Sequence, residues 1–434
     1  MTLFMDTSSR CPVPFLRDPP PAKYAVLSYS RSRPLRDWEK HVSSHAMPAS
    51  ASTPQNLAQA CRVAREHGIP YLWVHDVNYR RTASGTVLAS WRRIREAHLV
   101  IALLEGLIPP DSHNHNPCWL QNASAETLSA CGWFQCAWSL QDLVGSRSVT
   151  FFDSKWNLIG AKSPTSAHSW LQVLSRASGV DVQVLADRDA LSNISLGRRI
   201  SWAARRESLR PEDVAYSLAG ICGIGGQFPP RYGEGGQVAF QRLLEALLRR
   251  STDLSLLAWV RQQDTGRVEK GDKAISSLTG ILAKSPAEFR HFGSYPAWAT
   301  PFRSSITTDI TFSNRGLVVH GLLSSPRIPS GELCRQIVLV LKTPVPGDWV
   351  QVGITLGEVS SGLFARVKPH EVVILTSGKA SGAMGHICIH RSLDEIDTNP
   401  ISTVQGQPSS RVLSRAEKIP LRRCLSVVVI PLSS

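Results

Sequence analysis

Three features common in secreted and membrane proteins are missing from this sequence. Its nine cysteines among 434 residues do not form the dense framework of a small disulfide-stapled domain. The apolar run at 99–108 contains Glu105 and is far shorter than the roughly 20 residues that a membrane-spanning helix needs. The first residues lack the basic and apolar regions of a signal peptide. These absences favour a cytoplasmic protein with reduced thiols and no membrane span.

Acidic residues are also scarce. The sequence holds 48 lysines and arginines against 34 aspartates and glutamates, a formal net charge of +14. Such an excess favours acidic partners, nucleic acids and anionic lipids among them. The arginine pairs are scattered, however, and are not interleaved with aromatic residues as on a nucleic-acid-binding surface. We therefore expect no nucleic-acid partner.

Motifs of common phosphate-binding and hydrolytic sites are absent. No Gly-x-Ser-x-Gly elbow lies between a strand and a helix. Two glycine clusters, residues 223–226 and 233–236, lack the Gly-Lys-Ser/Thr ending of a phosphate loop. The second precedes an amphipathic helix, so an anion at that helix N-terminus is one interpretation. A turn that docks the helix is the favoured one.

A zinc site is the next alternative. The ligand types are present in His113, His115, Cys118, Cys131 and Cys136. The last two lie within an aromatic segment, where small residues pack between rings, and the histidines lie in a polar stretch typical of a loop. We predict no metal and no certain cofactor.

The first part of the chain alternates short apolar strands with helices. Fully apolar strands in this order predict an α/β fold with a parallel sheet covered on both faces. Ligand sites in such sheets lie beyond the carboxyl ends of the strands. The predicted strands are 24–29, 71–74 and 99–104, and the predicted helices start at Thr53-Pro54 and at about Val87. In the first helix Leu57, Ala60, Cys61 and Ala64 mark the apolar face and Gly68 the end.

The later part changes character. Runs rich in β-branched residues, separated by Pro, Gly and Ser, predict a mainly β domain of sandwich or barrel type. These runs are 316–323, 336–343, 350–359, 371–376, 386–390 and 425–432. The resulting division is a Pro-rich leader at 1–21, an α/β core at about 22–160, a helical extension at 161–260, a linker at 261–274 and a β-rich domain at 275–434.

The aromatic segment 131–160 is the most distinctive one in the chain. Taken with other short motifs in a fixed order, it resembles the fungal heterokaryon-incompatibility (HET) domain family over residues 22–259. The motifs are YAVLSY at 24–29, GIPYLWV at 68–74, GWF at 132–134, AWSLQDL at 137–143, VTFFD at 149–153, SWAARRE at 201–207, EDVAYSL at 212–218, YGEG at 232–235 and DLSLLAW at 253–259.

This resemblance implies non-self recognition between fungal cells that ends in growth arrest or programmed death, through protein partners or self-association. It also implies a fold similar to Toll/interleukin-1-receptor (TIR) domains, some of which cleave NAD. In those relatives a glutamate of a Trp-x-x-x-Glu-Leu-like segment lies near the nicotinamide ribose, and Trp138 to Leu143 occupies that place here. Candidate catalytic residues are then Asp142 and Asp76, with Ser28 and Trp138 as candidate ligand-binding residues.

The chain departs from the family pattern at the expected crevice. Arg31-Ser32 replaces a Trp-Gly pair, His75 and Arg80 replace two acids, and Asp142 is one methylene shorter than the usual glutamate. A displacement near 1 Å costs around a hundredfold in a positioned site. We therefore predict an incompatibility protein with weak or no catalytic activity, or a decoy paralogue. The alternative is an NAD glycohydrolase that uses Asp142, with NAD as its substrate.

Structural interpretations of the same residues stay open. Asp142 also fits a helix acid that faces solvent. His75 and Asp76 form an acid–base pair only if the strand has ended, because neighbouring strand residues point to opposite faces. The tryptophans at 133, 138 and 156 are typical core aromatics, and Cys61, on an apolar helix face, is expected to be inert.

Overall fold

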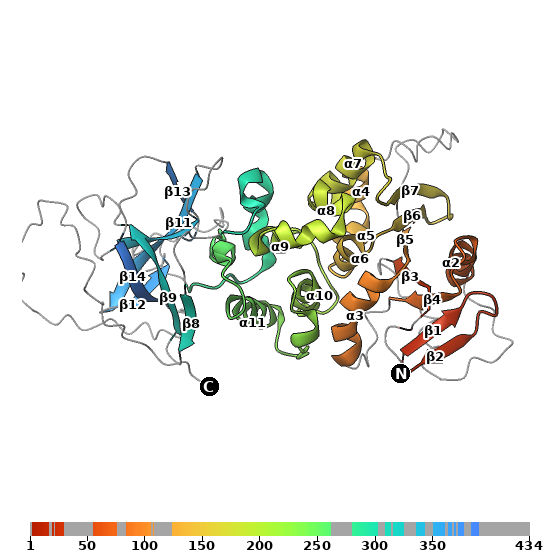
Figure 1. The fold of residues 1–434 in the computed structure, drawn as a ribbon, viewed down its shortest axis with the longest axis horizontal. Helices are drawn as coiled ribbons and strands as arrows, with labels where there is room; N and C mark the ends of the chain where they lie inside the picture. The colour runs from red at the N-terminus through yellow and green to blue at the C-terminus, as the bar shows by residue number, and fades with distance from the viewer. Residues whose placement is uncertain are drawn as a thin grey trace, which may run out of the picture. The chain divides into compact units, whose positions relative to one another are not determined.

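A computed structural model gives the fold of the chain in two compact units (Figure 1). It describes residues 2–16, 20, 22–29, 55–75, 84–105, 107, 124–261, 280–302, 309–313, 316–324, 336–342, 350–360, 363–366, 369, 372–376 and 383–389. Unit 1 comprises Met1–Leu247 with Lys284–Thr300, and unit 2 comprises Leu248–Ala283 with Pro301–Ser434. The chain therefore passes between the units three times, and most of the predicted linker lies outside the described residues.

Unit 1 is built on a seven-stranded sheet of order β2-β1-β4-β3-β5-β6-β7. Its centre is parallel, as predicted, and consists of β4 (Tyr71–Val74), β3 (Tyr24–Tyr29), β5 (Leu99–Leu104) and β6 (Val149–Asp153). The three strands predicted first are confirmed with their bounds. The order of the parallel strands reverses between β3 and β5, which is where open α/β sheets place ligands.

The sheet is mixed rather than wholly parallel. β1 (Thr2–Asp6) pairs antiparallel with β2 (Pro12–Phe15) and with β4, and β7 (Leu158–Lys162) pairs antiparallel with β6. The first two strands occupy residues that we assigned to a Pro-rich leader. Prolines at 12 and 14 are compatible with a strand here because β2 is an edge strand, where an N–H group need not pair.

Helices cover both faces of this sheet. On one face α2 (Gln55–Glu66) buries Leu57, Ala60, Cys61 and Ala64, the apolar positions predicted from spacing, against the strands. Gly68 ends this helix region with φ at 66°, a conformation that glycine adopts without steric cost. The other face carries α3 (Ser84–Glu96), α4 (Ala125–Ala130), α5 (Gly132–Gln135) and α6 (Ser139–Gly145).

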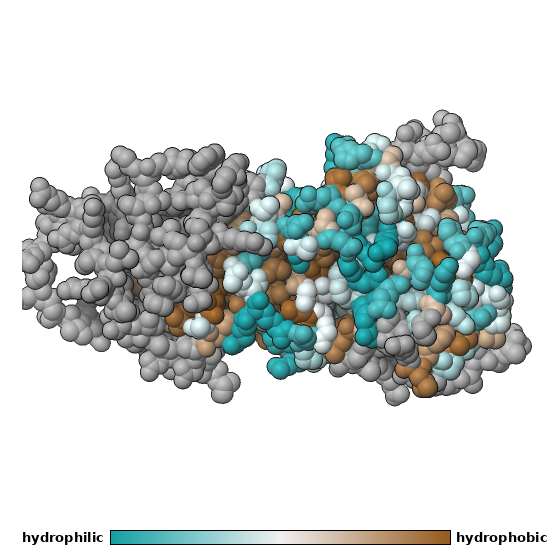
Figure 2. Space-filling view, viewed as in Figure 1, coloured by the Kyte–Doolittle hydropathy of each residue, from teal (hydrophilic) through white to brown (hydrophobic). Residues whose placement is uncertain are grey.

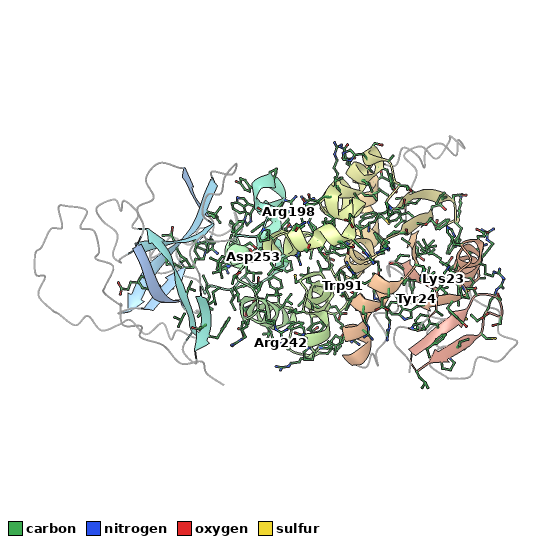
Figure 3. The ribbon with its side chains drawn as sticks, in the orientation of Figure 1. Lys23, Tyr24, Trp91, Arg198, Arg242 and Asp253 are labelled. Carbon is green, nitrogen blue, oxygen red and sulfur yellow. The ribbon has the colours of Figure 1, made fainter. Side chains whose placement is uncertain are left out.

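Residues after β7 are mainly helical, as expected for the extension. The helices are α7 (His168–Ser178), α8 (Val182–Ala186), α9 (Leu196–Ser201), α10 (Asp213–Ile221) and α11 (Gly236–Leu248), with the 3-10 turns η2 (Arg188–Asn193) and η3 (Gly225–Gln227). Tyr24 and Trp91 are labelled in Figure 3, and Trp91 lies where α3 meets α10. Its ring packs directly on the backbone of Gly220.

Segment 284–300 returns to unit 1 after the chain has entered unit 2. It forms η5 (Pro286–Ser294) and η6 (Pro296–Trp298) against α9. Arg198 of α9, labelled in Figure 3, donates to the Phe292 carbonyl, and Ser195 Oγ donates to the Trp298 carbonyl at 2.7 Å. The returning segment thus satisfies polar groups of the helical extension.

Unit 2 contains the β structure predicted for the later part. Its second sheet has the order β10-β11-β12-β14-β9-β8, with β13 paired to β11. The strands are β8 (Asp309–Ser313), β9 (Gly316–Ser324), β10 (Gln336–Lys342), β11 (Val350–Ser360), β12 (Leu363–Arg366), β13 (Val373–Thr376) and β14 (Ala383–Ile389). The turn η4 (Leu254–Leu257) also belongs to this unit. The strand predicted at 425–432 lies outside the described residues.

Two observations concern the surface. Within the described part of the chain, no helix combines the length and the apolar character needed to cross a bilayer. On the face that Figure 2 shows, hydrophobic residues of the described part form small separate groups among hydrophilic ones.

Candidate functional site

The side chains of β3 alternate between the two faces of the sheet, and this alternation places the first residue of the site. Leu27 points into the core under α2, so the next residue, Ser28, faces the opposite side of the sheet. Ser28 is buried at 3% exposure, near the carboxyl end of the strand. On that side it meets α6.

Asp142 of α6 is the centre of a buried polar cluster. Its side chain is 2% exposed, and Ser28 Oγ donates to its Oδ2 at 2.5 Å. Trp133 Nε1 donates in turn to Ser28 Oγ at 2.8 Å. On the other side, His75 Nδ1 lies 3.0 Å from Asp142 Oδ1 and 3.2 Å from Oδ2. We call Ser28, His75, Trp133 and Asp142 the Asp142 cluster.

His75 reaches this cluster because it continues the register of β4. Leu27 pairs with Val74, and the His75 amide donates to the Leu27 carbonyl at 3.1 Å, so His75 lies beside Ser28. It faces the same side as Trp73, two residues earlier, and the two rings lie 4.9 Å apart. Strand alternation from Trp73 thus predicts the side of the sheet that His75 faces, but not the residues that it meets there.

The structure brings together two of the four predicted site residues, Ser28 and Asp142. The interpretation of Asp142 as a solvent-facing helix acid is wrong, because every residue of its short helix is buried. Trp138, the third, is buried and stands edge-on to His75 with ring centres 6.0 Å apart. Asp76 lies outside the described residues, as do Arg80 and the Arg31-Ser32 pair. The roles of His75 and Trp133 were missed.

A buried arginine holds the aromatic segment in place. Arg206 donates through Nη1 to the Cys136 carbonyl at 2.9 Å and to Ser139 Oγ at 3.1 Å. Burial lowers the pKa of this guanidinium to about 10, while Cys136 and Asp142 nearby oppose that shift. The Ala137 amide also donates to the Glu207 carbonyl at 2.8 Å. The helical extension thus fixes the turn between Trp133 and α6, and with it the Asp142 cluster.

The other end of α6 is held by a buried lysine. Lys162 Nζ, on β7, donates to the Leu143 carbonyl at 2.9 Å and to the Ser146 carbonyl at 2.6 Å. Burial, with further contributions from Arg188 and Arg95, lowers the pKa of Lys162 to about 7. Carbonyls at a helix C-terminus attract such a donor, charged or neutral.

The lowered pKa of Lys162 predicts that the stability difference between the wild type and a variant without this lysine depends on pH. Between the folded pKa of about 7 and the unfolded value of 10.5, the unfolded chain holds the extra proton, so stability rises with pH. We expect the free energy of unfolding of the wild type, relative to Lys162→Met, to increase by about 2 kcal/mol from about pH 7 to about pH 9. Urea unfolding of both proteins at the two pH values measures it. A constant difference would show that the lysine keeps its ordinary pKa.

The glycine cluster before α11 is a docking turn. Gly233 and Gly235 have φ angles of 95° and 83°, and both donate their N–H groups to Glu212 Oε1, at 2.9 and 3.1 Å. The donors that an anion would use are therefore taken by a carboxylate. Arg242, labelled in Figure 3, pairs with Glu234 at 2.6 Å and completes the turn.

The structure describes only some of the remaining candidate residues. His113, His115 and Cys118 lie outside the described residues, and the described ones contain no group of three or more side chains placed to hold a metal ion. Burial raises the pKa of the Cys61 thiol to about 11 and also raises the pKa of Cys131. Both thiols therefore stay protonated near neutral pH.

The hydrogen bonds that the Asp142 carboxylate already makes limit the reactions in which it can take part. Both oxygens already accept hydrogen bonds from protein groups, and the side chain is buried. A carboxylate that stabilises a ribose oxocarbenium ion must face the sugar. As described, Asp142 instead balances and orients its neighbours Ser28 and His75.

Comparison with known proteins gives one relative. The chain is 34% identical over 154 residues to the protein named vegetative incompatibility protein HET-E-1 of Podospora anserina. The match covers 36% of this chain and 10% of that protein, so the matched part is about a tenth of the relative's length. No protein-family model and no solved structure matches the chain.

Proposed function

We propose that this chain is a HET-type protein of fungal vegetative incompatibility, in which unit 1 acts as a signalling module with weak or no catalytic activity. The observation that supports the role is the 34% identity to a vegetative incompatibility protein. The ordered motifs of residues 22–259 support the same family. In this proposal the module acts through protein partners or self-association inside the fungal cell and leads to growth arrest or death.

The state of Asp142 supports the weak or absent activity. Its carboxylate is 2% exposed and accepts hydrogen bonds from Ser28 and His75. A substrate ribose would have to displace these donors from a buried position, at a cost of several kcal/mol for an uncompensated buried charge. The family glutamate, one methylene longer, is replaced here by a side chain that ends within the protein.

A TIR-like NAD glycohydrolase that uses Asp142 is the second candidate. It is favoured by one observation, the meeting of Ser28 and Asp142 near the carboxyl end of β3, next to the point where the strand order reverses. A signalling module needs no such placement. The two candidates differ in whether the protein releases nicotinamide from NAD.

Inducible expression in a filamentous fungus, combined with a nicotinamide-release assay on the purified chain, separates these functions. We expect the wild type to arrest growth and to release no nicotinamide above background. Asp142→Asn keeps the shape of the side chain and should arrest growth equally. The matched control is Asp189→Asn, an acid whose side chain is 59% exposed and lies outside the cluster.

Two results would contradict the proposal. Unimpaired growth on expression of the wild type removes the incompatibility role. Release of nicotinamide that Asp142→Asn abolishes and Asp189→Asn preserves removes the non-enzymatic interpretation in favour of the second candidate. In that case Asp142→Glu should also be tested, because a longer acid would restore the reach of the family residue.

A further inference from the structure

One atom of the Asp142 cluster has no hydrogen-bond partner among the described residues. It is Nε2 of His75, which is buried along with the rest of its side chain, at 3% exposure. The other polar side-chain atoms of the cluster are paired: Trp133 donates to Ser28, Ser28 donates to Asp142, and Asp142 accepts from His75. A buried ring nitrogen without a partner costs free energy, so its position calls for a ligand or a water molecule.

The protonation of the ring follows from its neighbour. Asp142 has only lone pairs to offer, so His75 Nδ1 must carry the proton that lies between them. In the neutral ring Nε2 is then a bare acceptor. A carboxylate that fixes one tautomer and stabilises the imidazolium is the arrangement of a general base.

We propose that His75, rather than Asp142, is the proton-accepting group of this cluster, and that Asp142 is its positioning residue. The inference rests on the second candidate function for its substrate, a nucleotide with an N-glycosidic bond. Nε2 takes a proton from the attacking water as the water oxygen bonds to the anomeric carbon. The carbon–nitrogen bond breaks, and its electron pair leaves with the neutral nicotinamide.

The charges that face His75 permit this change of state. Asp142 on α6 compensates the proton gained by the ring directly. From α3, Arg93 lies over the Trp73 ring, 5.0 Å from its centre, and the centre of that ring is 4.9 Å from the centre of the His75 ring. Arg206 donates a hydrogen bond to Ser139 Oγ and interacts electrostatically with Asp142. The nearest charge is thus the one that stabilises a protonated ring.

Nuclear magnetic resonance of the full chain with ¹⁵N-labelled histidine tests the assignment without any substrate. We expect Nδ1 of His75 to carry the proton at about pH 8, and Nε2 to take one up reversibly on acidification while the fold is kept. His67, an exposed residue that directly follows α2 and whose Nδ1 lies 2.9 Å from the Val63 carbonyl, is the internal control. The opposite tautomer, or no proton uptake before unfolding, overturns the proposal.

A matched pair of variants tests the role in turnover. In His75→Asn the side-chain amide overlies Nδ1 and keeps the donor to Asp142, whereas in His75→Gln the amide reaches the place of Nε2. We expect His75→Asn to lose about 100-fold in kcat with KM little changed, the size of a general-base effect. Full activity of His75→Asn overturns the proposal, since Asp142 would then work without Nε2.

If the wild type releases no nicotinamide at all, the NAD candidate fails, and the magnetic resonance titration alone decides whether His75 accepts the proton.

Discussion

Gly220→Ala should lower the free energy of unfolding of unit 1 by about 2 kcal/mol, although alanine is favoured over glycine in a helix by about 1 kcal/mol. A Cβ at this position of α10 would lie 2.5 Å from Cγ and 2.6 Å from Cβ of Trp91. Neither atom is the far end of a flexible side chain. The indole must therefore shift, and its ring also packs against Gly145 of α6, where a Cβ would lie 2.9 Å away.

Urea unfolding followed by far-ultraviolet circular dichroism measures this effect. Gly226→Ala is the matched control, because a Cβ there meets no heavy atom within 4 Å, and it should change stability by less than about 0.5 kcal/mol. In a Trp91→Gly background, which lacks both the Cβ and the Cγ that meet the new methyl group, the cost of Gly220→Ala should largely vanish, since the two residues are coupled by contact. Equal costs in both backgrounds would mean that the clash lies elsewhere.

Arg366→Met should destabilise unit 2 by about 3 kcal/mol or more. The Arg366 side chain is fully buried and lies over the Trp259 ring at 3.9 Å from its centre. It donates to the Leu257 carbonyl at 3.1 Å and to the Trp259 carbonyl at 2.6 Å. Methionine fills much of the volume but leaves both carbonyls without this donor in a buried place, where each costs about 1–3 kcal/mol.

Two further substitutions calibrate the result. Arg366→Lys keeps a cation that can donate to a buried carbonyl, and should cost less than Arg366→Met. Arg261, whose guanidinium lies 5.3 Å from the same ring and which is half-exposed, should tolerate methionine at less than about 1 kcal/mol. Thermal unfolding read from near-ultraviolet circular dichroism compares the three proteins. An undisturbed transition in Arg366→Met would mean that the buried cation contributes nothing to unit 2.

The strands and the first helix of unit 1 were predictable because local patterns decide them. Runs such as that of Tyr24–Tyr29 are largely apolar and shorter than an ordinary helix, which favours a buried strand. The antiparallel strands β1 and β2 were not predictable in this way. Prolines at 12 and 14 argue against a strand locally, and only the position at a sheet edge, a tertiary property, removes the objection.

The candidate site was half predictable for a similar reason. Ser28 and Asp142 came from the family pattern, and the structure places them in contact. In the family pattern His75 was noted only because it replaces an acidic residue. Such a replacement does not tell which residues the new side chain contacts. Its pairing with Asp142 depends on the register between β3 and β4, which no single segment encodes. The motif SWAARRE likewise gave Arg206 no role, and its contacts with Cys136 and Ser139 are seen only in the structure.

The return of segment 284–300 to unit 1 bears on how this unit can be inherited or isolated. A gene fragment that stops at about residue 260, where the family resemblance ends, would omit the carbonyl partners of Arg198 and Ser195 and expose α9. A fragment that runs on to residue 302 keeps them, but carries the intervening stretch of unit 2 with it. Unit 1 is therefore not encoded by one continuous gene segment. We expect recombination to have moved the two units together.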